Sequence, residues 1–546
     1  MKRIANVILC MIVCLACLFP LVACSVDDAI TDTLVVYNWA DYIYDYKEDF
    51  QKYYSEMTGG RKIDITYVTF DTNETMLTKI MKGDSNVDVI CPSEYAIQKL
   101  LESDMLVKMN YQNQEKYLEG LTVGSNYVHN YGNVDQNVIE KVGEAFSEVS
   151  VGNRTENMLD YFVPYMYGTL GILYNKYTFM DLGIYDKDVM NNANWGILFN
   201  DNGSGQLLSE GLTGSILMKD SIRDSYAATV FYLLESGRLD GKKYQDKSSP
   251  YYDFLYTDMP VSALINAVDD QLLELCKEAL TNQKKQLFGY EVDFGKDDLL
   301  KGNAAVDLAW SGDALYAVEE SWNDDLGEDG DYELAYYVPH STGNIWFDGW
   351  VIPKTYNPDH ELAIKLFINF LNSPYAAAQN MMEIGYTSAV SPDVVRNDPA
   401  ARAVLMENYL VYDPDHEYWD SVNEKGKPLT EDTADYASWE EFEAYFFDNA
   451  DLSEIDDSNW RYPFESAKNA TTNRGIETLG VMRDFGPNNK AVVTMWNYAR
   501  SAGVSVWGVL GVTVGALALA AAIIALFVFA KGRLQSKVVI KKARDD

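Results

Sequence analysis

The chain has 546 residues, which is enough for two or more domains. Its 82 acidic residues outnumber 44 basic ones and give a net charge of −38. This balance disfavours nucleic acid as a partner, because phosphate contacts need clustered Lys and Arg, and it favours cationic ligands. Of six cysteines only Cys91 and Cys276 follow residue 24, so we expect no disulfide framework.

The first residues have the pattern of a secretory signal. Lys2 and Arg3 precede an uncharged run that ends in Leu-Val-Ala before Cys24. This ending resembles a bacterial lipobox, so we expect 1–23 to be a lipoprotein signal peptide and Cys24 to carry lipid. A chance cysteine after an ordinary apolar run is the alternative.

Strand and helix patterns alternate over the next segment. Strands are predicted over 34–37, 63–68 and 87–90, and helices over 45–57, 73–81 and 93–102. This βαβ order predicts an α/β fold with a doubly wound parallel sheet. In such sheets ligands bind beyond the C-terminal ends of the strands.

The middle of the chain continues the alternation after a polar, weakly periodic stretch over 112–157, which we interpret as an insertion. Further strands are predicted over 170–174, 304–309 and 349–352 and a helix over 361–371, while 214–219 is followed by the polar residues 220–224 and a helix that ends near 234. Residues 413–475 are strongly acidic and are expected to form a solvated insertion.

The C-terminal region carries a long uncharged segment. Residues 503–530 would form a helix of about 42 Å, long enough to cross a bilayer, and six basic residues follow it. The positive-inside rule places such basic residues in the cytoplasm. The sequence therefore predicts a transmembrane helix over 503–530, a cytoplasmic tail over 531–546 and an extracytoplasmic region over 24–502.

Four short segments combine aromatic and acidic residues near the ends of predicted strands. They are 37–42, 92–95, 310–313 and 346–348. Aromatic faces attract cations by roughly 0.5 to 2 kcal/mol, and carboxylates accept charge-assisted hydrogen bonds from ammonium groups. A cleft with this lining suits a slender organic cation that has methylenes between charged ends. Core packing of the rings and helix capping by the acids are the alternative roles.

The sequence carries none of the common catalytic motifs. It contains no Gly-x-Ser-x-Gly, no phosphate-binding loop and no His-Glu-x-x-His, and its four histidines are scattered. We therefore expect no catalytic residue, no cofactor and no metal, and we do not expect an enzyme.

Several of these segments recur in a known order. The chain resembles the polyamine-binding proteins of bacterial ABC importers, the spermidine/putrescine receptors, over 34–400 and less clearly to 500. The motifs are Tyr37-Asn38-Trp39, Asn73-Glu74-Thr75-Met76, Pro92-Ser93, Pro164-Tyr165, Trp310-Ser311-Gly312-Asp313, Trp346-Phe347-Asp348 and Ile384-Gly385-Tyr386-Thr387. The resemblance implies two α/β lobes of the type II periplasmic-binding-protein kind, with a ligand cleft between them. We expect one lobe to comprise 24–165 and 349–400, and the other 166–348 and 401–502.

The resemblance also implies a set of ligand-binding residues. Asp348 matches an ammonium-binding acid and Asp224 a second acid, while Asp41 and Asp313 match acids of putrescine-type receptors. Ser221 stands where spermidine receptors tend to carry Asp. The expected set is Trp39, Asp41, Tyr42, Ser93, Tyr95, Asp224, Trp310, Asp313, Trp346, Asp348 and Tyr386.

These patterns lead to one functional hypothesis and two alternatives. We expect a membrane-anchored extracytoplasmic receptor that captures putrescine or spermidine and delivers it to the permease and ATPase of an ABC importer. The acids at 41 and 313, together with Ser221, favour putrescine. The alternatives are a sensory ectodomain that binds an organic cation, and an acidic cell-surface hydrolase in which paired acids act as acid and base.

Overall fold

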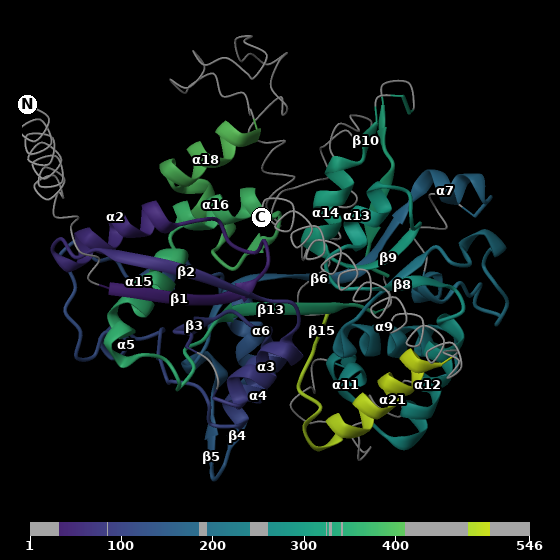
Figure 1. Ribbon diagram of the computed structural model, residues 1–546, viewed down its shortest axis with the longest axis horizontal. Coiled ribbons are helices and arrows are strands. Elements are labelled where there is room, and N and C mark those ends of the chain that lie inside the picture. Colours follow the sequence, from purple (N-terminus) through teal and green to yellow (C-terminus); the bar gives the residue numbers. More distant parts are fainter. Residues whose placement is uncertain are drawn as a thin grey trace, which may run out of the picture.

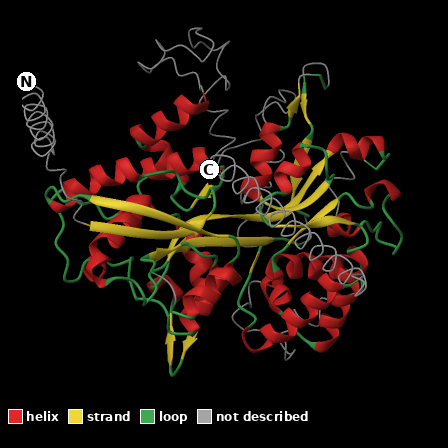
Figure 2. Cartoon of the chain, in the orientation of Figure 1, coloured by secondary structure: helices red, strands yellow, loops and turns green. Residues whose placement is uncertain are grey.

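Two α/β lobes lie side by side in the structure (Figures 1 and 2). The structure is a computed structural model that describes residues 32–83, 86–184, 194–240, 260–323, 325–326, 330–339, 342–409 and 479–502. Strands flanked by helices form each lobe, and the long strands β6 and β13 run through the middle of the molecule (Figure 1). The prediction of an α/β protein with two lobes is confirmed, whereas the residue boundaries of the lobes stay a prediction.

The first lobe is built on three parallel strands in the order β2-β1-β3. These strands are β1 (Asp32–Trp39), β2 (Ile63–Phe70) and β3 (Val89–Ile90). Its helices include α2 (Lys47–Thr58), α3 (Asn73–Met81), α4 (Glu94–Glu102), α15 (Glu361–Leu371), α16 (Pro374–Ile384), α17 (Pro392–Asn397) and α18 (Pro399–Tyr409).

Two antiparallel strands connect the lobes. All 13 residues of β6 (Val163–Asn175) are buried, and β13 (Asn344–Trp350) pairs with it. Isolated bridges join Ser93 to Asp348 and Ile90 to Val351, so β13 also contacts the first sheet. The site residues of β13 therefore lie between the two lobes.

The second lobe continues the sheet from the crossing strands in the order β15-β13-β6-β9-β7-β8, while β12 and β14 also pair with β6. The remaining strands are β7 (Ile216–Lys219), β8 (Leu287–Glu291), β9 (Val306–Trp310), β12 (Leu334–Tyr337), β14 (Thr387–Ser388) and β15 (Gly480–Val481). The helices of this part are α7 (Lys176–Asp181), α9 (Ile222–Glu235), α11 (Pro260–Asn266), α12 (Asp270–Gln283), α13 (Gly295–Leu300), α14 (Ser311–Glu320) and α21 (Asn489–Ser501).

Helix starts follow the capping residues of the sequence. Thr72 caps α3 through a capping box with Thr75. Ser221 caps α9, because its hydroxyl accepts the backbone N–H of Asp224 at 3.5 Å. This cap fixes the first turn of α9, which carries Asp224.

The segment 112–157, which the sequence analysis interprets as an insertion, forms regular elements in the structure. It forms α5 (Gln114–Tyr117), α6 (Gln136–Phe146) and the hairpin of β4 (Val149–Val151) and β5 (Arg154–Glu156). One face of α6 is apolar, and Val138, Val142 and Phe146 are fully buried in the core. The apolar residues of this face are spaced by a helical turn, so the segment packs as part of the core.

The fold prediction included a membrane-spanning helix, and the structure does not support this part of the prediction. No helix in the described ranges is long and apolar enough to cross a bilayer. The longest of them, α9 and α12, have 14 residues each, or about 21 Å against roughly 30 Å of bilayer hydrocarbon. Residues 503–530 lie outside the described ranges. So do the predicted signal over 1–23, Cys24, the whole predicted acidic insertion over 413–475 and the tail over 531–546.

Candidate functional site

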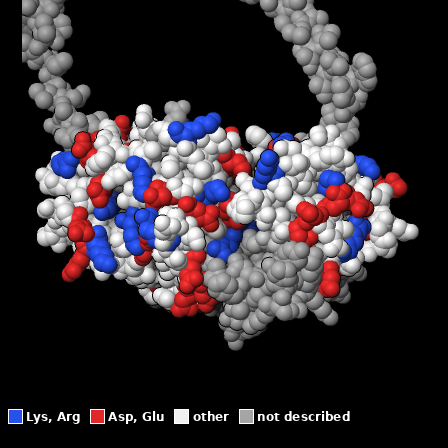
Figure 3. Space-filling model, turned by 90° about the horizontal axis from the view of Figure 1, so that it is seen from below, with Lys and Arg blue, Asp and Glu red and all other residues white. Residues whose placement is uncertain are grey.

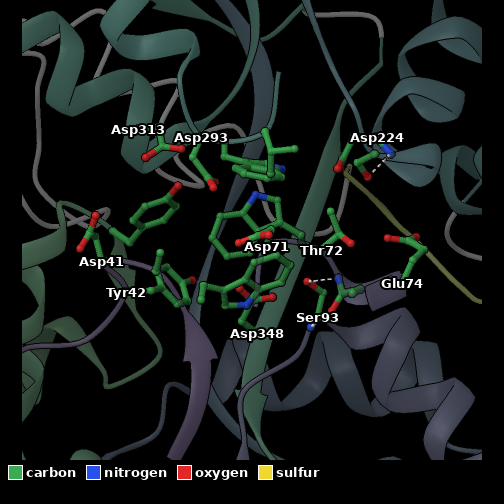
Figure 4. Close-up of a pocket in the computed structure, with 18 of the residues that line it drawn as sticks. Asp41, Tyr42, Asp71, Thr72, Glu74, Ser93, Asp224, Asp293, Asp313 and Asp348 are labelled. Carbon is green, nitrogen blue, oxygen red and sulfur yellow. Dashed lines mark hydrogen bonds between the residues drawn. The ribbon is translucent and has the colours of Figure 1, made fainter. Parts of the chain in front are cut away.

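A cavity of about 300 Å³ lies between the lobes, and residues from both lobes line it (Figure 4). The structure brings all eleven of the predicted ligand-binding residues to this one cavity. They come from the ends of β1 and β9, from β13, from the first turns of α4, α9 and α14, and from the turn before β14. Strand ends and helix starts meet at this edge of the sheets, as expected for an α/β protein.

Aromatic rings form much of the wall. The rings of Trp39 and Trp310 lie 6.4 Å apart between centroids and contact each other edge to face. Tyr386 contacts Tyr42 at 5.1 Å and Trp346 at 5.5 Å. These rings support one another, so their positions are fixed before any ligand enters.

Asp348 is the most enclosed of the predicted acids. It is 6% exposed and precedes a β-bulge in β13, where the register with β6 shifts between Asp348 and Gly349. Burial raises the pKa of Asp348 to about 7, and the hydroxyl groups of Ser93 and Tyr42 act to lower it. Its Oδ1 has no hydrogen-bond partner, which is costly in a buried group. This oxygen is therefore available to a ligand donor.

Glu94 is a second enclosed acid, and the predicted set omitted it. It is fully buried, and its Oε2 accepts the backbone N–H of Phe347 at 2.9 Å. Its Oε1 has no partner, and burial raises its pKa to about 8. The segment 92–95 had been singled out for its acid and its ring, so the sequence signal was present.

Glu74 and Asp224 lie at one end of the cavity (Figure 4). Glu74 comes from α3 in the first lobe and Asp224 from α9 in the second. Burial raises the pKa of Glu74, and the negative charge of Asp224 raises it further. Two like charges from different lobes repel each other across the cleft, so a cation between them is favoured.

Asp41 and Asp313 lie at the other end of the cavity (Figure 4). Asp41 is exposed and has a positive φ of 49°, a conformation that Asp tolerates better than most residues. Asp313 is already paired, because Lys296 Nζ lies 2.7 Å from its Oδ1. The two acids of the putrescine-type pattern thus have different surroundings.

The polar residues Ser93 and Tyr95 are held by a third residue. Asn73 donates from Nδ2 to Ser93 Oγ and to Tyr95 Oη, both at 3.0 Å. Asn73 also accepts the backbone N–H of Ser93 at 3.3 Å. This network joins α3 to the start of α4 and orients both side chains in the wall.

The sequence that forms this cavity matches a known protein family over much of its length. A family model described as bacterial extracellular solute-binding protein matches residues 46–408, more than half of the chain. The chain belongs to the bacterial extracellular solute-binding protein family. Because its members bind solutes and its curated relatives are periplasmic binding proteins, the prediction that the chain is not an enzyme is confirmed.

Two curated relatives of this solute-binding protein have low sequence identity to it but align over about two thirds of its length. It is 25% identical over 388 residues to the putrescine-binding periplasmic protein SpuD of Pseudomonas aeruginosa (strain UCBPP-PA14), with 67% of this chain and 82% of the relative aligned. It is 22% identical over 383 residues to the putrescine-binding periplasmic protein PotF of Escherichia coli (strain K12), with 70% and 83% aligned.

A solved structure of a spermidine/putrescine ABC transporter substrate-binding protein from Streptococcus pneumoniae is also similar. It is 24% identical, covers 71% of this chain and 95% of its own, and has a TM-score of 0.43.

Further residues of the solute-binding protein line the cavity without having been predicted. They come from the segment after β1, from the turn after β2 and the start of α3, from the first residue of α4, from the cap of α9, from the turn after β8 and the start of α13, and from the segment after β15. They comprise Ala40, Asp71, Thr72, Asn73, Glu74, Glu94, Ser221, Val292, Asp293, Phe294, Lys296, Asp297 and Met482. Met482 lies beyond the region that the family model matches. No cluster of metal-binding side chains occurs among the described residues.

The charge of the cavity is strongly negative. Nine acidic residues line it, against Lys296 as the one basic residue among the described lining residues. On the face of the molecule shown in Figure 3, by contrast, basic and acidic side chains are interspersed. The concentration of carboxylates is therefore a property of the cavity and not of that outer face.

Proposed function

We propose that this solute-binding protein binds a polyamine, held by carboxylates at its ammonium groups and by aromatic rings along its methylenes. The observation that carries the proposal is Asp348 Oδ1, a buried carboxylate oxygen without a partner in a cavity walled by Trp39, Trp310 and Trp346. A buried unpaired carboxylate is stabilised by an ammonium ligand, and the rings attract the same charge.

The size and charge of the cavity agree with a small organic cation. Its volume of about 300 Å³ lies at the lower end of the range for small-molecule sites. Sugars and acidic amino acids would leave most of the nine carboxylates unpaired or repelled. Relatives that are 22–25% identical carry names that describe putrescine binding, which supports the same ligand class.

Each predicted residue has a proposed role in this account. Asp348 binds one ammonium group, and Asp224 with Glu74 binds another at the far end of the cavity. Ser93 and Tyr95 exchange hydrogen bonds with the ligand at the polar edge of the cavity. The remaining members of the predicted set form the walls or the opposite end: Trp39, Asp41, Tyr42, Trp310, Asp313, Trp346 and Tyr386.

We further propose that the protein acts on the outer face of the cell as the receptor of an ABC importer. Lipid attached at Cys24 would keep it near the permease, and ligand would draw the two lobes together into the form that the permease recognises. The lipobox-like ending at Cys24 and the family membership support this part of the proposal.

Mass spectrometry of small molecules released from the purified protein tests the ligand class. We expect a polyamine at close to one molecule per chain. Release of a sugar, a peptide or an anionic amino acid in that proportion would overturn the proposal.

A further inference from the structure

Lys296 forms an ion pair with Asp313, an acid that the sequence analysis predicted to bind the ligand. Its Nζ lies 2.7 Å from Asp313 Oδ1, and both side chains are largely buried, with 28% and 16% exposed. Although burial lowers the pKa of Lys296, Asp313 raises it more, so the side chain stays cationic. The ring of Tyr316, 5.6 Å from Nζ, gives the ammonium group a further favourable contact.

A second lysine lies close to this part of the wall, with its charge balanced by a buried carboxylate. Lys219 is 2% exposed, and its Nζ lies 4.2 Å from the centre of the Trp310 ring. Glu291 at 2.5 Å and the carbonyl oxygen of Val292 at 2.9 Å hold it there. One aromatic wall of the cavity therefore already contacts a cation of the protein.

Basic side chains also lie near other acids of the wall, since the buried guanidinium group of Arg223 acts to lower the pKa of Glu74 and of Asp224. Asp313 pairs with Lys296 of α13, and Asp297 pairs with Lys301, the residue that follows α13. No ion pair with a described base is found for the other lining acids, which are Asp41, Asp71, Glu74, Glu94, Asp224, Asp293 and Asp348. Asp313 is thus an acid of the wall whose charge a lining base already balances, and it lies at the end of the cavity opposite Glu74 and Asp224 (Figure 4).

We propose that Lys296 is a specificity-determining residue, a tethered ammonium group that fills the Asp313 end of the cavity and limits the ligand to a diamine. The inference rests on the proposed function. A diamine places one ammonium at Asp348 and one at the end formed by Glu74 and Asp224. A triamine that extended toward Asp313 would bring its third ammonium against Lys296, and like charges in a closed site repel strongly.

The inference gives Asp313 a different role from the one predicted. Asp313 holds Lys296 in place and does not bind the ligand directly. Removal of Lys296 frees this carboxylate for a ligand ammonium, and only a longer polyamine has an ammonium group to spare for it. The gain on removal is therefore larger for spermidine than for putrescine.

Calorimetric titration of the purified protein with putrescine and with spermidine tests the inference. The variants are Lys296→Met and Lys296→Gln, which remove the charge, and Lys296→Arg, which keeps it. Lys277→Met is the matched control, since Lys277 pairs with Glu274 on α12 away from the cavity. Melting temperatures of all four variants show that each is folded.

We expect the ratio of the spermidine to the putrescine dissociation constant to fall at least tenfold in Lys296→Met and Lys296→Gln. In Lys296→Arg and Lys277→Met it should stay within about twofold of the original. An unchanged ratio in both neutral variants, or an equal change for both ligands, would overturn the inference while leaving polyamine binding intact. A wild-type protein that binds neither ligand would instead overturn the proposed function, and this inference with it.

Discussion

The backbone N–H of Phe347 donates to Glu94 Oε2 over 2.9 Å and so fixes a carboxyl group of α4 beside the strand that carries Asp348. Burial raises the pKa of Asp348 to about 7 and that of Glu94 to about 8, and the charge of Asp348 contributes to the second shift. Each acid also keeps one oxygen without a partner. The empty cavity therefore holds two carboxyl groups that gain or lose protons near neutral pH.

Binding of a cation should depend on pH through this pair. Below pH 7 Asp348 takes up a proton and loses the charge that attracts an ammonium group, so affinity should fall by roughly tenfold for each pH unit below 7. Calorimetry at pH 6 and pH 8, in buffers of different ionisation enthalpy, should also detect protons released on binding. Affinity that is equal at the two pH values, without proton release, would contradict the role of Asp348.

The raised pKa of Asp348 should also make the stability of the ligand-free protein depend on pH. The pKa of Asp348 is about 7 in the folded state and near 3.9 in the unfolded chain, so the folded state binds more protons between about pH 4 and pH 7. The contribution of this group to stability is therefore greatest at low pH and is lost as pH rises through that window. Asp348→Asn should raise the melting temperature more at pH 8 than at pH 5, and an equal effect at both would show that the carboxyl group is not shifted.

Asp348→Asn should weaken polyamine binding strongly while leaving the protein folded. Truncation of one partner in a buried charged pair costs roughly 2 to 5 kcal/mol, which is a rise in dissociation constant of about 30-fold or more. Asp64→Asn is the control, because Asp64 is exposed on β2 and the net charge changes equally. A dissociation constant within twofold of the wild-type value would place the ammonium site elsewhere.

Gly312→Ala should disturb the site through Tyr386. A Cβ atom at Gly312 would overlap the ring of Tyr386, which contacts both Tyr42 and Trp346 in the cavity wall. Overpacking of this kind typically costs about 1 to 3 kcal/mol, so both affinity and melting temperature should fall.

Gly289→Ala provides the comparison, since the nearest atom to its Cβ would be Leu217 Cδ2 at 4.0 Å. This variant should bind polyamine as the wild type does. If Gly312→Ala kept full affinity, the position of Tyr386 would not matter for binding.

Much of the site could be predicted because its residues occur in compact segments at strand ends. Trp39 ends β1, Trp310 ends β9 and Asp348 lies in β13, so a reading of strand order already places them on one edge. Helix α3 over 73–81 and helix α15 over 361–371 also agree with their predicted bounds, because Thr72 caps α3 and a run of apolar residues defines α15.

The residues that were missed depend on tertiary contacts. Lys296 reaches the cavity because α13 follows β8 at the sheet edge, and its contact with Asp313 joins residues 17 positions apart. Asp293 and Phe294 beside it form an acidic and aromatic pair that the sequence analysis did not single out. Met482 comes from a segment that pairs with β13 only after the chain has passed through 410–478. The start of β13 was placed at 349 and not at 344, because the buried polar residues Asn344 and Asp348 interrupt the apolar pattern of a strand.

Calorimetric titration of the purified protein with a ligand panel is the most direct test of whether the cavity binds a polyamine. The panel contains putrescine, spermidine, a neutral hexose and glutamate at pH 8, where Asp348 is ionised. The account predicts saturable binding of a polyamine, with putrescine the tighter of the two, and at least 100-fold weaker binding of the hexose and of glutamate. Tighter binding of the hexose or of glutamate than of either polyamine would contradict it.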